Sequence, residues 1–250
     1  MNSRNLCISL ALGIAASAQW AHATIIPFTD NFASGPLDAS FSLVGSGGAY
    51  NGTGQYVITD TETGTGTIAG LQRTIGVGDF RARLDAVNIT STASGNFVYY
   101  WQIRDAASFA APGIAVGLGL GSPNMLTTFL FDSSGNITQQ WQTALPSGTL
   151  PENLDLSITW RGAPSGGGQW DELYDTSGGT PTTEFNGGPF HDTYDAQPTR
   201  TMYAFIDEYG TTGTASAGLD YFSIVPEPTS LATLSIGALA LLARRRIGVT

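Results

Sequence analysis

Acidic side chains are the most plentiful charged residues in this 250-residue chain. It holds 20 Asp and Glu residues but only one cysteine, Cys7, and two histidines, His22 and His191. Cys7 and His22 fall in an N-terminal segment that we expect to be removed. A Cys–His site and a zinc site of histidines and cysteines are therefore excluded. A Ser–His–Asp site could use only His191, which we expect in a loop, and no G-x-S-x-G motif is present.

Calcium is the metal that the carboxylates could bind, since it prefers carboxylate and carbonyl oxygens. The candidate pairs are Asp30 with Asp220, near the two ends of the expected body, and Asp192 with Asp195. No D-x-D-x-D-G loop occurs, and solvated turn acids are the favoured interpretation of each pair. We predict no cofactor and leave calcium at Asp30 and Asp220 open.

Aromatic side chains could stack on sugar rings. Trp170 follows a glycine-rich stretch and precedes two acids, so we predict that it lies at the surface. Trp160 is in phase with the apolar residues of 154–158, which predicts a place in the core. Adjacent residues of Tyr99-Tyr100-Trp101 must point to opposite faces of a strand. The candidate glycan contacts are Trp170, Tyr174 and Tyr100, and core packing is the alternative for each.

The body between Thr24 and Val225 is acidic, with six arginines, no lysine and 19 acidic residues. Its net charge of −13 argues against nucleic acid as a partner, because proteins that bind nucleic acids need a basic face. Cations and neutral sugars remain possible partners, and solubility alone would explain the charge.

Short strands should build this body. Alternation of apolar with polar or small residues predicts strands at 80–86, 114–120, 154–160, 202–207 and 219–224. The best hairpin is 129–141, in which Asp132 to Asn136 form the turn, and other turns are expected at 45–54, 61–66, 162–168 and 176–180. About a dozen strands and no amphipathic helix predict one antiparallel sandwich or barrel at 24–224.

The two ends of the body give the fold a more specific resemblance. Asp30-Asn31-Phe32 opens the body and Leu219 to Ile224, LDYFSI, closes it. These strings resemble the first and last strands of concanavalin A-like jelly rolls, including laminin-G-like and glucanase-like domains, which commonly lie close together. Glucanase-like members carry their acids as E-x-D-x-E or E-x-D-x-x-E. Neither pattern occurs, Glu172 and Asp175 come nearest, and we predict that the protein is not an enzyme.

The first 23 residues read as a secretory signal peptide. Arg4 supplies the positive start, 6–18 form the apolar region, and Ala21-His22-Ala23 is the cleavage motif, so the mature chain should begin at Thr24. Signal peptidase is the implied partner. The mature chain would hold no cysteine, and hence no disulfide.

The C-terminus carries a second targeting segment. Pro226-Glu227-Pro228 precedes an uncharged segment of about 228–243 and then Arg244, Arg245 and Arg246. This order resembles the PEP-CTERM sorting signal at 225–250, which implies a Gram-negative host and processing by an exosortase. The segment should form a helix that holds the chain in the inner membrane, with the arginines on the cytoplasmic side. The two prolines should keep the motif extended and outside any sheet. A plain, uncleaved anchor is the alternative.

Together these features predict an exported protein of the outer surface or extracellular matrix with a structural or adhesive role. A carbohydrate-binding module for extracellular polysaccharide is the first alternative, and a secreted glycan hydrolase is the second. Exposed aromatic side chains on a sheet face would favour binding. Two carboxylates in one cleft would favour hydrolysis.

Overall fold

The computed structural model describes residues 25–33, 35–63, 68–76, 78–92, 97–119, 124–145, 150–162, 167–185, 188–192, 200–208 and 212–227. The predicted signal peptide, with Ala21, Ala23 and Thr24 at its cleavage site, lies outside these residues. So do Pro228, the predicted C-terminal helix and Arg244 to Arg246. Across the described ranges, no helix has the length and apolar character needed to cross a membrane.

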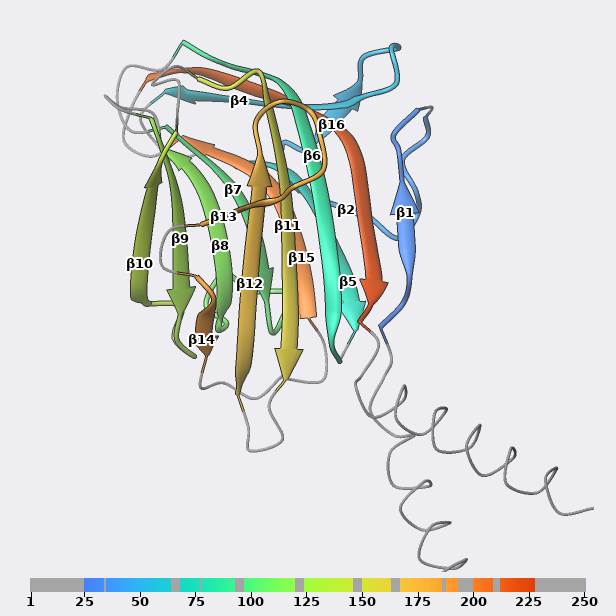
Figure 1. Ribbon diagram of the computed structural model, residues 1–250. Coiled ribbons are helices and arrows are strands. Elements are labelled where there is room, and N and C mark those ends of the chain that lie inside the picture. Colours follow the sequence, from blue (N-terminus) through green and yellow to red (C-terminus); the bar gives the residue numbers. More distant parts are fainter. Residues whose placement is uncertain are drawn as a thin grey trace, which may run out of the picture.

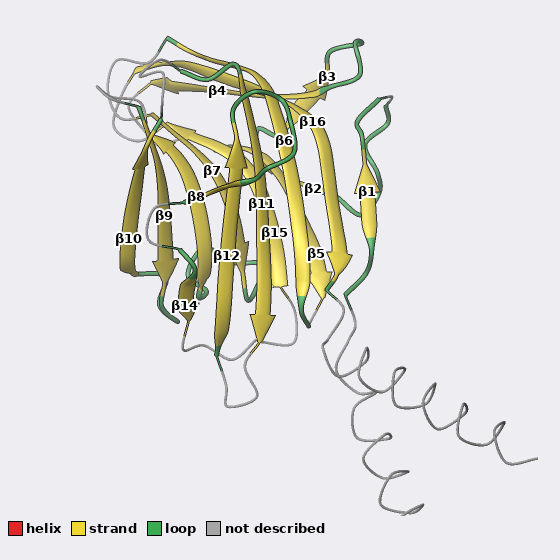
Figure 2. Cartoon of the chain, in the orientation of Figure 1, coloured by secondary structure: helices red, strands yellow, loops and turns green. Residues whose placement is uncertain are grey.

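Two antiparallel sheets face each other (Figure 1, Figure 2). The nine-stranded sheet has the order β13 (Thr183–Glu184), β12 (Gly168–Asp175), β11 (Asn153–Gly162), β6 (Phe80–Ser91), β16 (Thr212–Pro226), β4 (Tyr56–Thr63) and β3 (Gly48–Tyr50), with β1 (Phe28–Asp30) on β16 and β14 (Phe190–Asp192) on β12. The seven-stranded sheet has the order β10 (Ile137–Ala144), β9 (Met125–Phe131), β8 (Gly113–Gly119), β7 (Phe97–Arg104), β15 (Arg200–Glu208), β5 (Ile68–Gly76) and β2 (Ser42–Gly45). The predicted antiparallel sandwich is therefore confirmed.

The first and last strands of the body lie side by side, as the opening and closing strings predicted. Phe28 is in register with Ile224, and Asp30 with Phe222. The Phe28 ring meets the edge of Phe222 at 5.9 Å between centroids and that of Phe41 at 5.3 Å. Figure 1 shows β1 beside the C-terminal half of β16. This pairing joins the two ends of the body over one aromatic cluster.

Alternation along the strands fills the space between the sheets. Ile114, Val116 and Leu118 of β8 are buried in the core, while the small residues between them face the other way. The hairpin of β9 and β10 forms about Asp132, whose carboxylate accepts the backbone N–H groups of Ser134 and Asn136 at 2.8 and 2.9 Å. Both predictions are confirmed. No helix occurs among the residues that the structure describes.

Three local predictions are wrong. The stretch 45–54 is not a single turn, because β3 lies inside it and pairs with β4. His191 lies in the short strand β14, opposite Gln169, and not in a loop. Pro226 is not outside the sheet, since it ends β16 in register with Phe80. Proline has no backbone N–H to donate, and the end of a strand tolerates it because the hydrogen-bond ladder stops there.

Candidate functional site

The outer face of the seven-stranded sheet carries a strip of small residues between two rows of larger ones. On β8 the small residues are Gly113, Ala115 and Gly117. They lie in register with Arg104, Gln102 and Tyr100 of β7 on one side, and with Phe131, Phe129 and Thr127 of β9 on the other. Because side chains alternate between faces, all of these point away from the core that holds Trp101 and Ile103. The large side chains therefore flank a low floor.

A hollow of about 320 Å³ opens over this floor. We call it the aromatic groove. Its lining residues are Ile68, Tyr100, Gln102, Arg104, Phe109, Phe129, Phe131 and Ile137. The Phe129 ring lies 6.0 Å from that of Tyr100 and 6.3 Å from that of Phe131, so three half-buried rings form one run. Phe109 and Ile137 are exposed at its rim.

Arg104 fixes the base of the aromatic groove. Its guanidinium lies 3.3 Å from the centroid of the Phe131 ring, within cation–π distance. The Arg104 Nε group donates to Gln102 Oε1 at 2.8 Å, and Nη1 donates to the Ala111 carbonyl at 2.9 Å. Arg104 and Gln102 are both buried. The ring of Phe131 is thus held in place by a cation that is itself held by two hydrogen bonds.

The rim of the groove is set by the β9–β10 hairpin and the loop before β8. Gly135 adopts a φ of +76°, and a Cβ there would come within 2.7 Å of the Phe109 carbonyl oxygen. Glycine thus lets the hairpin turn pack directly on the loop that carries Phe109. The same turn leads into Ile137, on the other side of the opening.

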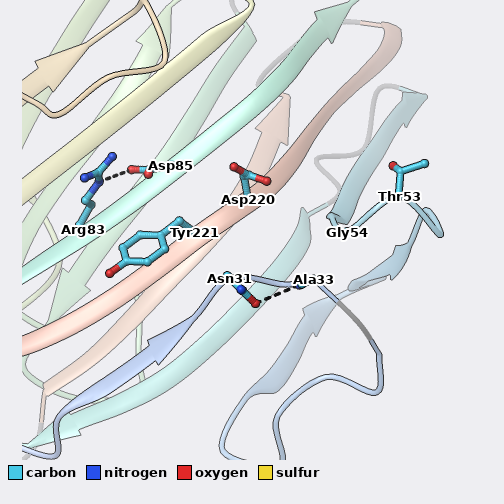
Figure 3. A pocket seen from close by; sticks show the side chains of 8 residues that line it. All are labelled: Asn31, Ala33, Thr53, Gly54, Arg83, Asp85, Asp220 and Tyr221. Carbon is cyan, nitrogen blue, oxygen red and sulfur yellow. Dashed lines mark hydrogen bonds and ion pairs between the residues drawn. The ribbon is translucent and has the colours of Figure 1, made fainter.

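A second hollow, of about 470 Å³, lies on the outer face of the nine-stranded sheet (Figure 3). We call it the polar pocket. Its lining residues are Asn31, Ala33, Thr53, Gly54, Arg83, Asp85, Asp220 and Tyr221. Figure 3 shows Arg83 turned toward Asp85, and its Nε lies 2.6 Å from Asp85 Oδ1. Arg83 Nη2 also donates to the Gly179 carbonyl at 3.0 Å. The Arg83 guanidinium therefore already has two partners within the protein, Asp85 and the Gly179 carbonyl.

Carboxylates crowd around Arg83. Burial, and after it the neighbouring Asp85, raise the pKa of Asp155 to about 7. Burial also raises the pKa of Asp85, against the opposing effect of Arg83. The pKa of Arg83 is raised in turn, first by its hydrogen bond to Asp85. The polar pocket therefore holds one arginine and two carboxylates, and Arg83 is already paired with Asp85.

The proposed surface position of Trp170 is wrong. Trp170 is only 1% exposed and Tyr174 only 6%, since both point into the core from β12. Trp170 lies opposite Trp160 on β11, with ring centroids 4.5 Å apart, and Phe190 of β14 lies on its other side. Trp160 is buried, as predicted. Of the three candidate glycan contacts, Tyr100 lines the aromatic groove.

The acidic candidates are not assembled into a recognisable centre. Asp220 lines the polar pocket, whereas Asp30 is not among its lining residues and accepts the Phe32 N–H at 2.8 Å. Within the described part of the chain, no group of three or more His, Cys, Asp or Glu residues is placed to hold a metal. Calcium at Asp30 and Asp220 stays a prediction, and Asp195 of the other pair lies outside the described residues.

Glu172 and Asp175 do not form a catalytic pair. Residues three apart on a strand project from opposite faces. Glu172 points into the core, where the Thr128 hydroxyl donates to its Oε2, while the Asp175 side chain accepts the N–H of Gly179 in the turn after β12. Two groups on opposite sides of one sheet cannot flank one glycosidic bond.

Comparison with known proteins addresses the tail first. Residues 225–246 match the PEP-CTERM protein-sorting motif. The chain ends in a PEP-CTERM sorting motif. Proteins with this motif are exported and sorted to the cell surface, and the motif implies processing by an exosortase. No curated protein matches the chain by sequence.

The body has the concanavalin A-like jelly-roll fold. It is similar to a laminarinase from Flavobacterium sp. UMI-01, with a TM-score of 0.53, 12% identity and coverage of 80% of this chain and 99% of that one. It is also similar to the Emp47p carbohydrate recognition domain, with a TM-score of 0.51, 7% identity and coverage of 83% and 97%. A third similar structure comes from work on endo-acting O-glycanases of the human gut microbiota (TM-score 0.54, 14% identity, 82% and 100% covered). At these identities the likeness shows the fold alone.

Sequence reasoning missed most of the aromatic groove. The alternation of 114–120 with small residues predicts a strand, but it does not by itself indicate a floor beneath aromatic rings. Phe129 and Phe131 were visible only as the arm of a hairpin. The signal that could have found them is the small-residue row of β8, because a row of glycine and alanine on an outer face leaves room for ring faces from both neighbours.

Proposed function

We propose that this chain is an adhesive protein of the cell surface whose body binds extracellular polysaccharide through the aromatic groove. The observation that carries the proposal is the run of Tyr100, Phe129 and Phe131 over the floor of β8. Aromatic side chains normally bury most of their ring surface. A row of half-exposed rings in a hollow is typical of a binding surface. Adhesion and glycan binding are then one role.

The chemistry of the groove suits a sugar ring. Sugars present one apolar face of C–H groups, which can lie on an aromatic ring, while hydroxyls accept and donate hydrogen bonds at the edges. Phe129 and Tyr100 supply ring faces, and the Tyr100 hydroxyl supplies a polar group. A hollow of about 320 Å³ is at the small end of ligand sites, so we expect it to hold a short stretch of a longer chain.

Binding without cleavage fits the groove. No Asp or Glu is among its lining residues, and Arg104 is its only charged one. Hydrolysis of a glycosidic bond by the usual route requires two carboxylates on either side of it. We therefore propose a non-catalytic role.

Removing one ring should weaken binding. We expect Phe129→Ala and Tyr100→Ala each to raise the Kd for the recognised polysaccharide about tenfold, as the loss of an aromatic anchor does at other interfaces. Affinity electrophoresis of the intact protein in gels containing bacterial exopolysaccharides would measure the change. Tyr221→Ala is the matched control, because Tyr221 is a half-buried aromatic residue of the polar pocket on the other sheet.

Two results would count against the proposal. If Tyr221→Ala weakens binding as strongly as Phe129→Ala, the aromatic groove is not the site. If the unmodified protein is retained by no polysaccharide on a broad glycan array, glycan binding is wrong and a purely structural role remains.

A further inference from the structure

The sorting motif begins inside the folded body. Pro226 is the last residue of β16, in register with Phe80 of β6. The next residue is also bound, because the Glu227 N–H donates to the Asp79 carbonyl at 3.0 Å. The first two residues of the Pro-Glu-Pro motif are therefore held at the end of the sheet where β6 begins.

Two arginines hold the Glu227 side chain. Arg81 Nη2 lies 3.1 Å from Glu227 Oε1, and Arg161 Nη2 lies 3.9 Å from Oε2. Arg161 is oriented by a second ion pair, from its Nη1 to Asp171. The Glu227 side chain is only 17% exposed, whereas those of Arg81 and Arg161 are 52% and 45% exposed. The arginines thus cover the carboxylate from the solvent side.

Asp79 joins this arrangement to the strand ends. Its carboxylate accepts the Gly162 N–H at 2.9 Å, just after Arg161, while its carbonyl accepts the Glu227 N–H. Arg81 also lies in register with Thr159, so β6 and β11 bring the two arginines to one place. The cluster is built from three segments that are far apart in the sequence.

We propose that the body restrains processing of its own tail: Arg81 and Arg161 compete with the sorting enzyme for Glu227. A peptidase that reads Pro-Glu-Pro has to take that segment as an extended, accessible chain. In the folded body, however, the Glu227 N–H is hydrogen-bonded to Asp79, and the Glu227 side chain is paired with Arg81 and Arg161. Processing then requires the end of β16 to detach first. This inference rests on the proposed sorting of the chain by its C-terminal motif.

The charges give the restraint a modest size. Partly exposed ion pairs are weak individually, and salt screens them. Losing two of them should shift an opening equilibrium about 3- to 10-fold. The restraint would slow processing without preventing it, which would give the body time to fold before its anchor is removed.

The test follows processing of the full chain in a host that has the sorting enzyme. A pulse-chase experiment with an antibody against the last residues of the chain measures how fast they are lost. We expect the double variant R81Q/R161Q to lose them about 3- to 10-fold faster. R81K/R161K should stay near the original rate, because it keeps both charges. Arg83→Gln is the control, since this neighbour on β6 pairs with Asp85 and not with Glu227.

A second measurement separates docking from processing. In the unprocessed chain from a host without the enzyme, we expect the Glu227 amide to be protected from hydrogen exchange and R81Q/R161Q to reduce that protection. An unprotected amide in the unmodified chain overturns the inference. So does a double variant that is processed at the original rate or more slowly. If even the unmodified chain is never processed, the sorting role itself is wrong.

Discussion

Replacing Trp170 with alanine should lower the free energy of unfolding by about 3–5 kcal/mol, and Trp160→Ala should do the same. Both indoles are 1% exposed and touch across β11 and β12, and Phe80 lies beyond them at 6.1 Å from the Trp170 centroid. On the other side Phe190 meets Trp141 of the opposite sheet at 4.3 Å. One row of rings therefore bridges the two sheets, and chemical denaturation would measure the loss.

The Trp pair also permits a sharper test than either variant alone. Because the rings are in contact, the double variant should cost about 0.5–1.5 kcal/mol less than the sum of the single variants. Tyr100→Ala is a matched control, since that ring faces the aromatic groove and should cost much less. A Trp170→Ala variant as stable as the Tyr100→Ala variant would contradict the position of Trp170 in the core.

Several strands and the hairpin turn were predictable because they depend on local signals. Alternation in 154–160 and the turn residues at Asp132 act over a few positions, and the structure confirms both. The pairing of the first and last strands came from resemblance, and the register of Phe28 with Ile224 bears it out.

The phase of β12 could not be read from its sequence. One side carries Trp170, Glu172 and Tyr174, and the other carries Asp171, Leu173 and Asp175, so each side mixes apolar and acidic residues. The contacts across strands decide between them: Trp160 lies opposite Trp170. Gly168 leaves room for the Trp160 ring, because a Cβ at this position would come within 2.4 Å of it. Such contacts join residues that no local pattern connects.

The same limit applies to the surface features. Arg81 and Arg161 are 80 positions apart, and the registers of β6 with β11 and with β16 place them both beside Glu227. The aromatic groove likewise depends on three strands keeping their small and large rows in step. The alternation along one strand shows which of its residues share a face, but it does not show which residues of the neighbouring strands lie beside them.

Glu172 should make the protein less stable as the pH rises from about 4.5 to 8. Complete burial raises its pKa to about 8, against the smaller, opposing effect of the hydrogen bond from Thr128. Its Oε1 is buried and has no hydrogen-bond partner among the described residues. The core therefore holds this side chain as a neutral acid at neutral pH.

The sign follows from proton binding. Between pH 4.5 and 8 the folded protein keeps the Glu172 proton and the unfolded chain has lost it, so each increase in pH favours unfolding. The stabilisation is complete below the ordinary pKa of 4.5 and is lost as the pH rises through the folded pKa of about 8. At about 1.4 kcal/mol per pKa unit, the change approaches about 5 kcal/mol across that window.

Glu172→Gln isolates this contribution, because an amide of the same shape does not titrate. Asp155 also has a raised pKa, of about 7, and adds a slope of the same sign in both proteins. The difference between the two unfolding free energies, measured by urea denaturation at intervals from pH 4 to 9, should therefore change by about 5 kcal/mol in favour of the variant. Any constant cost of placing an amide in the core moves this difference curve up or down but leaves its slope intact. A flat difference curve would show that Glu172 reaches water or a cation in the folded protein, and that the core does not hold it as a neutral acid.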